Sequence, residues 1–147
     1  MQANNRDVGS LWDRVSAIRR VQEFTASLTY SIFLRGEAHA ALTRQGLIDH
    51  PCASLASKML YEAYLDNILV QSAVERQLEI LGEAARRLSN EFRQAHPEIG
   101  WRRVIGLRNI LIHRYDEIRQ ETIWKTAISE LEPLRTQLET LLSSWPD

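Results

Sequence analysis

The sequence contains few of the features that mark secreted or membrane-bound proteins. A single cysteine, Cys52, excludes a framework of disulfides within the chain and is consistent with a reducing cytoplasm. The longest uninterrupted apolar runs are only a few residues, far short of a membrane span. Residues 1–7 are polar and lead into no apolar stretch, so no secretory signal is expected. We therefore expect a cytoplasmic protein.

Neither sign of charge is in excess. Lysine and arginine total 18 and aspartate and glutamate total 19, which gives a formal net charge of −1. A chain with this balance has no overall attraction for nucleic acid, so any such site would have to be a local patch. The length of 147 residues and the hydrophobic fraction of 44% suffice to bury the core of one domain.

Apolar residues recur at steps of three and four, which is the period of an amphipathic helix. This pattern predicts a first helix over about residues 8–28. It predicts a second helix from near Glu62 to just before Pro97, because proline disfavours helical geometry in the preceding residue. A third helix is expected to start near Gly100. No run alternates convincingly with the period of two expected for a strand, so we expect an all-α, four- to five-helix up-and-down bundle.

A fourth helix is predicted from Ile123 or Trp124 to about Trp145. Pro133 lies inside its apolar stripe. A proline ring clashes with the carbonyl four residues earlier, here that of Ser129, so a kink is expected at this point.

Residues 31–60 interrupt the helical pattern. Two glycines and Pro51 break it, while residues 37–44 and 53–60 have the composition of short helices. We expect this stretch to form an excursion from the bundle.

Gly82 lies in the middle of the second predicted helix. A glycine in a helix interior costs about 1 kcal/mol relative to alanine. It indicates close approach by another backbone, although a tolerated glycine is the simpler alternative.

His113 has neighbours that suit cleavage of RNA. A histidine near a helix end is usually a surface or capping residue, but Arg108, Asn109, Arg114 and Tyr115 surround this one in sequence. Attack by a 2′-hydroxyl needs a base for that hydroxyl, an acid for the leaving oxygen and positive charge on the phosphorane. Histidine suits the first two tasks, and the fixed donor fork of arginine suits the third. This chemistry requires no metal.

The spacing restricts how these side chains can meet. On an ideal helix Arg108 and His113 point roughly 140° apart, whereas Asn109 and His113 share a face. Arg108 and His113 can therefore converge only if the helix ends near Ile112, or if two copies of the chain meet. A single histidine in the segment also favours a dimer, which would supply two imidazoles to one cleft.

Arginine is locally in excess around this segment. Residues 86–119 contain eight arginines against four acids. The strongest candidates for phosphate contacts are Arg102 and Arg103, with Arg114 a further one, and an ordinary solvated helix surface is the alternative. The sequence has neither the histidine and cysteine spacing of a metal site nor the glycine pattern of a P-loop, so no cofactor is expected.

Residues 107–115 resemble the Arg-x4-His-x-Tyr motif of the HEPN superfamily. They resemble more closely the HepT-like toxins, which are paired with a minimal nucleotidyltransferase (MNT) antitoxin. The similarity extends through residues 71–84 and 96–99 and Trp101, and more loosely through residues 17–30 and the last helix. Residues 31–60 fit poorly and look like an insertion in a single HEPN-like domain over residues 1–147.

The resemblance implies the toxin of a type VII-like toxin–antitoxin system. Such a toxin is a homodimeric, metal-independent endoribonuclease that cleaves RNA, either tRNA or mRNA, by attack of the 2′-hydroxyl. By resemblance Arg108 and His113 are catalytic, Asn109 supports them, and Tyr115 accepts AMP from the antitoxin, which uses ATP. Phosphate and adenine on Tyr115 would place negative charge and bulk where an RNA phosphate must lie.

Two alternatives remain from the sequence. The chain could be a non-catalytic helical module that docks a nucleotidyltransferase, or a plain dimeric scaffold that uses its first and last helices. The combination of Arg108, His113 and Tyr115 favours the enzyme, because a docking helix has no need of this set.

Overall fold

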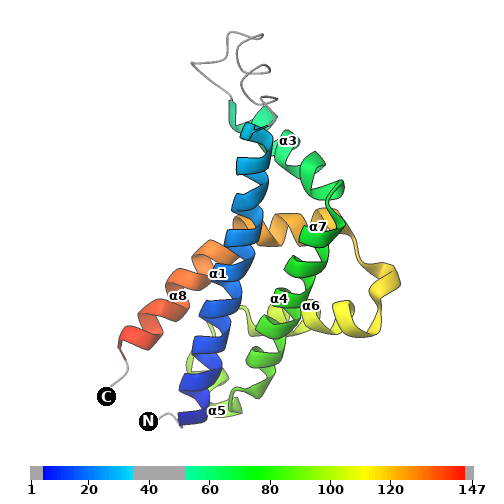
Figure 1. Ribbon diagram of the computed structural model, residues 1–147. Coiled ribbons are helices and arrows are strands. Elements are labelled where there is room, and N and C mark those ends of the chain that lie inside the picture. Colours follow the sequence, from blue (N-terminus) through cyan, green and yellow to red (C-terminus); the bar gives the residue numbers. More distant parts are fainter. Residues whose placement is uncertain (1–4, 35–51, 145–147) are drawn as a thin grey trace.

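The computed structural model describes residues 5–34 and 52–144, and these residues form helices and turns without any strand (Figure 1). The predicted all-α class is therefore confirmed. Among the described helices, none combines the length and the hydropathy that crossing a bilayer demands. The elements in chain order are α1 (Asn5–Leu34), α3 (Cys52–Leu65), α4 (Ile68–Arg87), α5 (Asn90–Ala95), α6 (Trp101–His113), a 3-10 turn η1 (Tyr115–Glu117), α7 (Gln120–Lys125), a π-helical stretch η2 (Thr126–Glu130) and α8 (Leu131–Ser143).

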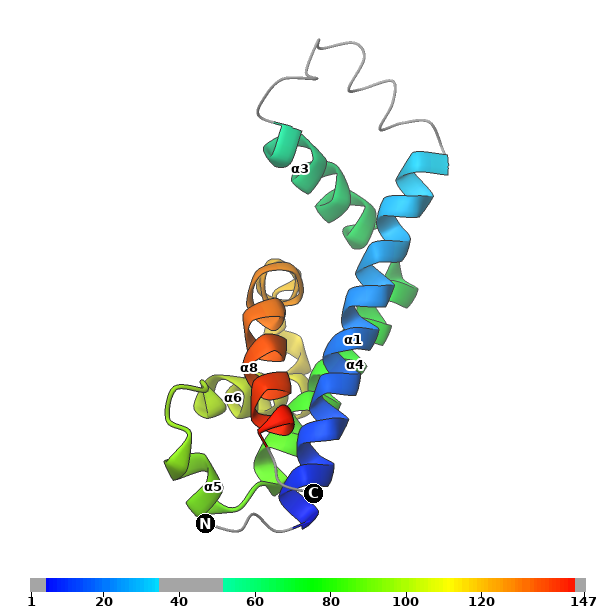
Figure 2. The same cartoon turned by 90° about the vertical axis from the view of Figure 1, so that its left-hand side faces the viewer.

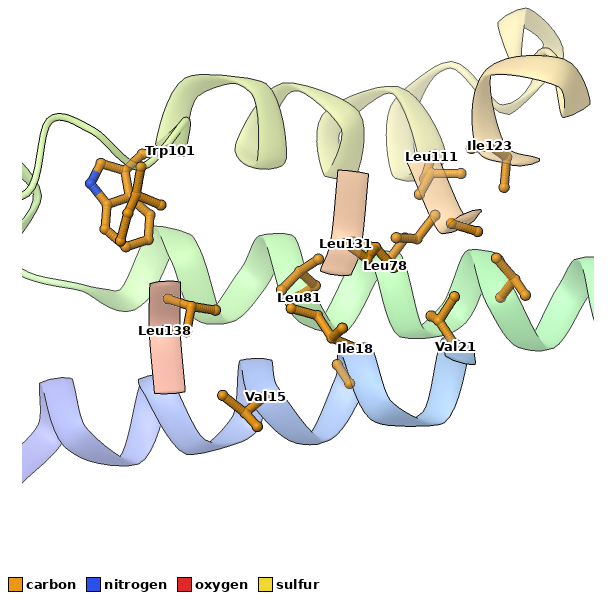
Figure 3. Close-up of a cluster of buried hydrophobic side chains, with 14 of the residues drawn as sticks. Val15, Ile18, Val21, Leu78, Leu81, Trp101, Leu111, Ile123, Leu131 and Leu138 are labelled. Atoms are coloured by element: carbon orange, nitrogen blue, oxygen red, sulfur yellow. The ribbon is translucent and has the colours of Figure 1, made fainter. Parts of the chain in front are cut away.

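The core is centred on the antiparallel pair α1 and α4, with α6 packed across α4 and α8 against α1 (Figures 1 and 2). Apolar residues spaced by three and four place one buried stripe on each helix, and the two stripes face each other. Each fully buried leucine, isoleucine or valine stabilises the fold by roughly 1.5–3 kcal/mol. The stripe of α1 includes Val15, Ile18 and Val21, and it meets Leu78 and Leu81 of α4 (Figure 3).

The second predicted helix is in fact three elements, so that prediction was wrong in its bounds. α3 ends at Leu65, and the side chain of Asn67 caps α4 by accepting a hydrogen bond of 3.1 Å from the backbone N–H of Val70. α4 then ends at Arg87, and the Ser89 hydroxyl accepts from the N–H of Phe92 at 3.2 Å to begin α5. The apolar stripe does not reveal such breaks, because a cap redirects the chain without changing which residues are buried.

The predicted distortion of the last helix is present. The chain is helical from Gln120, a few residues earlier than expected, and becomes π-helical over η2 immediately before α8. The five residues of η2 include Ser129, whose carbonyl an undistorted helix would place against the ring of Pro133. A wider π turn is a known way to relieve that clash.

Two parts of the stretch predicted to interrupt the helical pattern are helical. α1 runs six residues beyond the predicted end at residue 28, so residues 31–34 belong to it, and the helix expected over residues 53–60 lies within α3. The helix expected over residues 37–44 lies outside the described residues. That residues 31–60 are an insertion stays a prediction.

Arg14 is a buried cation within the core. Its side chain, on α1, is 1% exposed, and its guanidinium carbon lies 4.4 Å from the centroid of the Trp101 ring. None of its three nitrogens has a hydrogen-bond partner within the described residues. Burial, with a smaller contribution from the charge of Arg93, lowers the pKa of Arg14 to about 9. The cation–π contact offsets only part of the desolvation cost.

We expect the substitution Arg14→Met to raise the melting temperature. Methionine keeps the length and the apolar contact with Trp101 and removes the unpaired charge, which should stabilise the fold by about 1–4 kcal/mol. The charged Arg14 side chain destabilises the fold fully below pH 9. Above pH 9 this destabilisation decreases, because Arg14 loses its proton at a lower pH in the folded chain than in the unfolded chain. Thermal unfolding followed by circular dichroism should therefore show a difference in melting temperature between Arg14→Met and the wild-type chain that becomes smaller above pH 9. A less stable variant would contradict this account.

Candidate active site

α6 is the helix that carries the catalytic candidates, and both of its ends are well defined. At its start, the Trp101 indole N–H donates to the backbone oxygens of Arg93 and His96, at 3.2 and 2.9 Å. At its end, the backbone N–H of Arg114 donates to the Ile110 carbonyl at 2.9 Å and closes the last turn. The residues expected to act on RNA thus lie on the last turns of a helix whose other end is buried.

Gly82 sets the distance between α4 and α6. A Cβ atom at this position would lie 2.2 Å from the Cβ of Arg108 and 3.0 Å from the carbonyl oxygen of Val104. The helices can therefore cross this closely only because residue 82 has no side chain. The expected close approach by another backbone is confirmed, and the residue that fills the space is the catalytic candidate Arg108.

Arg108 points toward α4 rather than toward solvent. Its side chain is 17% exposed, and its Nη2 lies 3.2 Å from Oε2 of Glu83. Its Nη1 donates a 3.0 Å hydrogen bond to Oδ1 of Asn109, while its Nε has no partner within the described residues. The supporting role expected for Asn109 has a physical counterpart here, because its side chain fixes the other edge of the guanidinium.

Glu83 is the functional neighbour that the sequence did not reveal. Its carboxylate also accepts hydrogen bonds from Arg86 at 3.1 Å and from Arg87 at 3.4 Å. The hydrogen bonds from Arg86, and the charges of Arg86 and Arg108, hold the pKa of the Glu83 carboxyl below its ordinary value. Residues 83, 86 and 87 have the spacing of ion pairs on one helix, so that part could have been read from the sequence. The contact with Arg108 could not.

His113 is the last residue of α6, and its side chain is exposed. Within the described residues it makes no hydrogen bond or ion pair, so its ring nitrogens are accessible. α6 continues through His113 and does not end at Ile112, which leaves Arg108 and His113 about 140° apart on the helix. The structure therefore does not bring the two side chains together within one chain.

The remaining predicted residues differ in their surroundings. Arg102 is exposed, Arg103 pairs with Glu130, and Arg114 pairs with Glu117 at 3.5 Å. The backbone of Tyr115 begins η1, but its side chain lies outside the described part of the structure.

The segment that follows Tyr115 is anchored at Gln120. The Gln120 amide donates to Oε1 of Glu75 on α4 at 2.6 Å and accepts from the Tyr64 hydroxyl on α3 at 2.6 Å. Burial raises the pKa of Tyr64, with the charge of Glu75 adding to it, so this hydroxyl stays a donor. These two hydrogen bonds therefore tie the first residue of α7 to α3 and α4.

A hollow of 360 Å³ lies beside Arg108 and is lined by residues of α1, α4 and α6. Its charged side chains are Arg76, Arg87 and Arg108 and the acids Asp13, Glu79 and Glu83. It reaches Ile112, next to His113.

A larger hollow of 470 Å³ involves α6 and α8 but includes none of the predicted catalytic residues, and its lining is mostly apolar. We take the smaller one as the candidate site, because it contains the guanidinium groups that chemistry on a phosphate requires. Within the residues described, no three metal-binding side chains gather.

The chain is similar to a ribonuclease family and to proteins named as ribonucleases. The family model described as "Ribonuclease HepT-like" matches residues 15–141. "Putative RNase MJ1380" of Methanocaldococcus jannaschii is 38% identical over 79 residues, which cover 54% of this chain and 72% of that protein. "Probable ribonuclease HepT" of Thermococcus cleftensis is 37% identical over 84 residues, 57% of this chain and 76% of that protein. No solved structure matches the chain.

The family model covers most of the chain, including α4 and all of α6, and both relatives are matched over more than two thirds of their own length. The chain therefore belongs to the ribonuclease HepT-like family.

Proposed function

We propose that this chain is a metal-independent endoribonuclease toxin whose chemistry is carried out by His113 and Arg108. The observation that carries the proposal is the contrast between the two side chains. His113 is exposed and has no hydrogen-bond or ion-pair partner within the described residues, whereas Arg108 is held by a carboxylate and an amide beside a hollow whose lining includes two further arginines. Phosphodiester cleavage needs a general acid or base, for which the accessible imidazole of His113 is suited, and a preorganised cation, for which Arg108 is suited.

In the proposed reaction the 2′-oxygen of the RNA attacks the adjacent phosphorus. One histidine takes the proton of that hydroxyl, the bond between phosphorus and the 5′-oxygen breaks, and a second, protonated histidine gives its proton to the leaving oxygen. The products are a 2′,3′-cyclic phosphate and a free 5′-hydroxyl. The Arg108 guanidinium compensates the charge that develops on the phosphorane oxygens.

Because Arg108 and His113 diverge on α6, the site would need groups from a second copy of the chain. The outward face of α6 carries Asn109 and His113 together with the partly exposed side chains Ile110 and Ile112. Gly106, at the flank of this face, lines the larger hollow together with Ile110, and a Cβ there would meet nothing within 4 Å. We propose a homodimer in which the α6 helices face each other and two His113 side chains share one cleft.

The test is cleavage of RNA by the purified chain in the presence of EDTA. We expect products with 2′,3′-cyclic phosphate ends, and resistance of substrates with a 2′-deoxy sugar at the cleaved position. Loss of cleavage on chelation would contradict the metal-free reaction, and an active monomer in sedimentation would contradict the shared cleft. A wild-type chain that cuts no RNA but binds a nucleotidyltransferase would favour the docking module instead.

We further propose that an MNT antitoxin silences the enzyme by AMP transfer to Tyr115. The Tyr115 hydroxyl would attack the α-phosphorus of ATP held by the antitoxin and release pyrophosphate. Tyr115 lies two residues beyond His113 in a turn whose neighbours Arg114 and Asp116 are exposed, which makes the segment accessible to a second protein. The added phosphate and adenine would exclude RNA by charge and by bulk.

Tyr115→Phe is expected to keep substantial ribonuclease activity and to escape the antitoxin. The phenyl ring retains the shape of tyrosine but has no oxygen to modify. Cells that express this variant together with the partner should remain poisoned, whereas wild-type cells should grow. Mass spectrometry of the wild-type chain made with its partner and ATP should show AMP on the peptide that contains Tyr115, and none on Tyr61 or Tyr64. A variant that the partner still silences would mean that simple occlusion causes inhibition.

A further inference from the structure

Three arginines gather around one carboxylate where α4 crosses α6. Nitrogens of Arg86, Arg87 and Arg108 lie 3.1, 3.4 and 3.2 Å from the oxygens of Glu83. We call this group the arginine cluster. One negative charge facing three positive charges leaves an excess of two within this group, and the other charged residues of the adjoining hollow, Arg76, Asp13 and Glu79, reduce it to one. By contrast, Arg103 pairs with Glu130 and Arg114 with Glu117, one to one, so neither pair carries such an excess.

Two of the three guanidinium groups can reach a ligand. The side chains of Arg86 and Arg87 are 59% and 55% exposed, whereas that of Arg108 is 17% exposed. Exposed ion pairs contribute little to stability, so Arg86 and Arg87 can exchange Glu83 for another anion at small cost. Their guanidinium groups offer the paired donors that phosphate oxygens accept.

The cluster is continuous with the proposed site of cleavage. The hollow beside Arg108 is lined by both Arg87 and Arg108, and it extends to Ile112. Ile112 precedes His113, and both side chains are exposed. An anionic chain that follows this hollow would therefore pass Arg87 and Arg108 and reach Ile112, next to His113.

We propose that Arg86 and Arg87, gathered with Arg108 around Glu83, form a second phosphate-binding subsite that holds an RNA phosphodiester neighbouring the one that is cleaved. This inference rests on the proposed function for the identity of its ligand. Glu83 is then a positioning residue: it orients Arg108 for the reaction, and it contacts no substrate itself.

The test measures RNA binding separately from cleavage. All variants carry His113→Ala and are titrated with a single-stranded RNA that has a 2′-deoxy sugar at the cleaved position, by fluorescence anisotropy at several salt concentrations. In this background Arg86→Ala with Arg87→Ala should raise Kd about tenfold or more. The salt dependence of log Kd should also fall by roughly 0.7 for each phosphate that the variant no longer binds.

Arg19→Ala is the matched control. Arg19 is 55% exposed, as Arg87 is, and it pairs with a single carboxylate, that of Glu139, at 3.0 Å. Its removal deletes one exposed arginine outside the cluster, so both Kd and the salt dependence should stay near those of the parent. An equal loss of affinity in the Arg19 variant, or an unchanged Kd in the double variant, would overturn the subsite.

Glu83→Gln tests whether the charge of Glu83 or its shape matters. This variant retains His113, so that kcat can be measured. Glutamine preserves an oxygen acceptor but removes the negative charge, so RNA binding should be equal or tighter while kcat falls at least tenfold because Arg108 is held less firmly. If Glu83 were only structural, the kcat of Glu83→Gln would fall only in proportion to the fraction of the variant that is unfolded. Weaker RNA binding by this variant would contradict the proposal.

Arg86 and Arg87 also lie in the last turn of α4, where cations stabilise a helix end. If their replacement by alanine unfolds the chain, Arg86→Lys with Arg87→Lys keeps the charge and the helix end. That variant should retain most of the salt dependence and lose affinity only a few-fold; full loss of the salt dependence in a folded protein would overturn the proposal. A wild-type chain that cleaves no RNA, but whose binding depends on the cluster, would contradict the proposed function and leave the subsite standing.

Discussion

His113→Ala should abolish RNA cleavage and growth inhibition without disturbing the fold. The side chain is exposed at the end of α6 and has no partner within the described residues, so its removal breaks no packing and no hydrogen bond. Substitutions of this kind change the free energy of unfolding by about 0.5 kcal/mol or less. Loss of a group that transfers protons in the rate-limiting step lowers the rate by roughly 10²–10⁴-fold.

The measurement is cleavage of a labelled RNA, together with the circular dichroism spectrum and the melting temperature of each variant. His96→Ala is a useful comparison, because His96 is a histidine at the end of α5, bonded to Glu98 at 3.3 Å and outside the proposed site. That variant should remain active. If His113→Ala is unfolded, the residue is structural, and if it is folded and active, the catalytic assignment is wrong.

Arg108→Ala should also be inactive, and Arg108→Lys should recover little of the activity. Removing one preorganised donor from a charged transition state costs roughly 10²–10³-fold in kcat. Lysine restores the charge but has a single ammonium group, which cannot hold Glu83 and Asn109 on separate nitrogens while it also presents a fork to phosphate.

Arg108→Ala should still fold, because it preserves the packing where α4 crosses α6. The atom of residue 108 that lies against Gly82 is its Cβ, and alanine retains it. Glu83 also keeps Arg86 and Arg87 as partners, so no carboxylate is left without a counter-charge. The melting temperature should therefore stay close to that of the wild-type chain while kcat collapses. Substantial activity in Arg108→Lys would show that charge alone is sufficient.

The sequence pattern predicted the helices well and their ends poorly. The buried stripes of α1 and α4 follow from the spacing of apolar residues alone. The breaks at Asn67 and Ser89 depend on single side-chain hydrogen bonds to the first turns of α4 and α5, which the apolar pattern does not register. The distortion before Pro133 could be predicted, because it follows from the covalent geometry of proline and needs no tertiary contact.

The same distinction applies to the candidate site. The 140° separation of Arg108 and His113 is a property of the helix itself, so the proposal of a second copy follows from their spacing in the sequence. The contact between Arg108 and Glu83 could not be predicted, because it joins two helices and depends on how closely they cross. Gly82 was the one usable hint: its position in the sequence indicated a close approach, and the structure identifies Arg108 and Val104 as the groups that approach.

The crossing at Gly82 also limits how this chain can change over generations of mutation. Residue 82 faces the interior side of α6 and is not among the groups proposed to contact RNA, yet any side chain there would displace the arginine that does. Restoring the space would require glycine at position 108, because the nearest atom is the Cβ of Arg108, and that change would delete the guanidinium. The two positions therefore cannot change independently, and selection on the proposed catalytic residue Arg108 would also act on residue 82, which is not proposed to contact RNA.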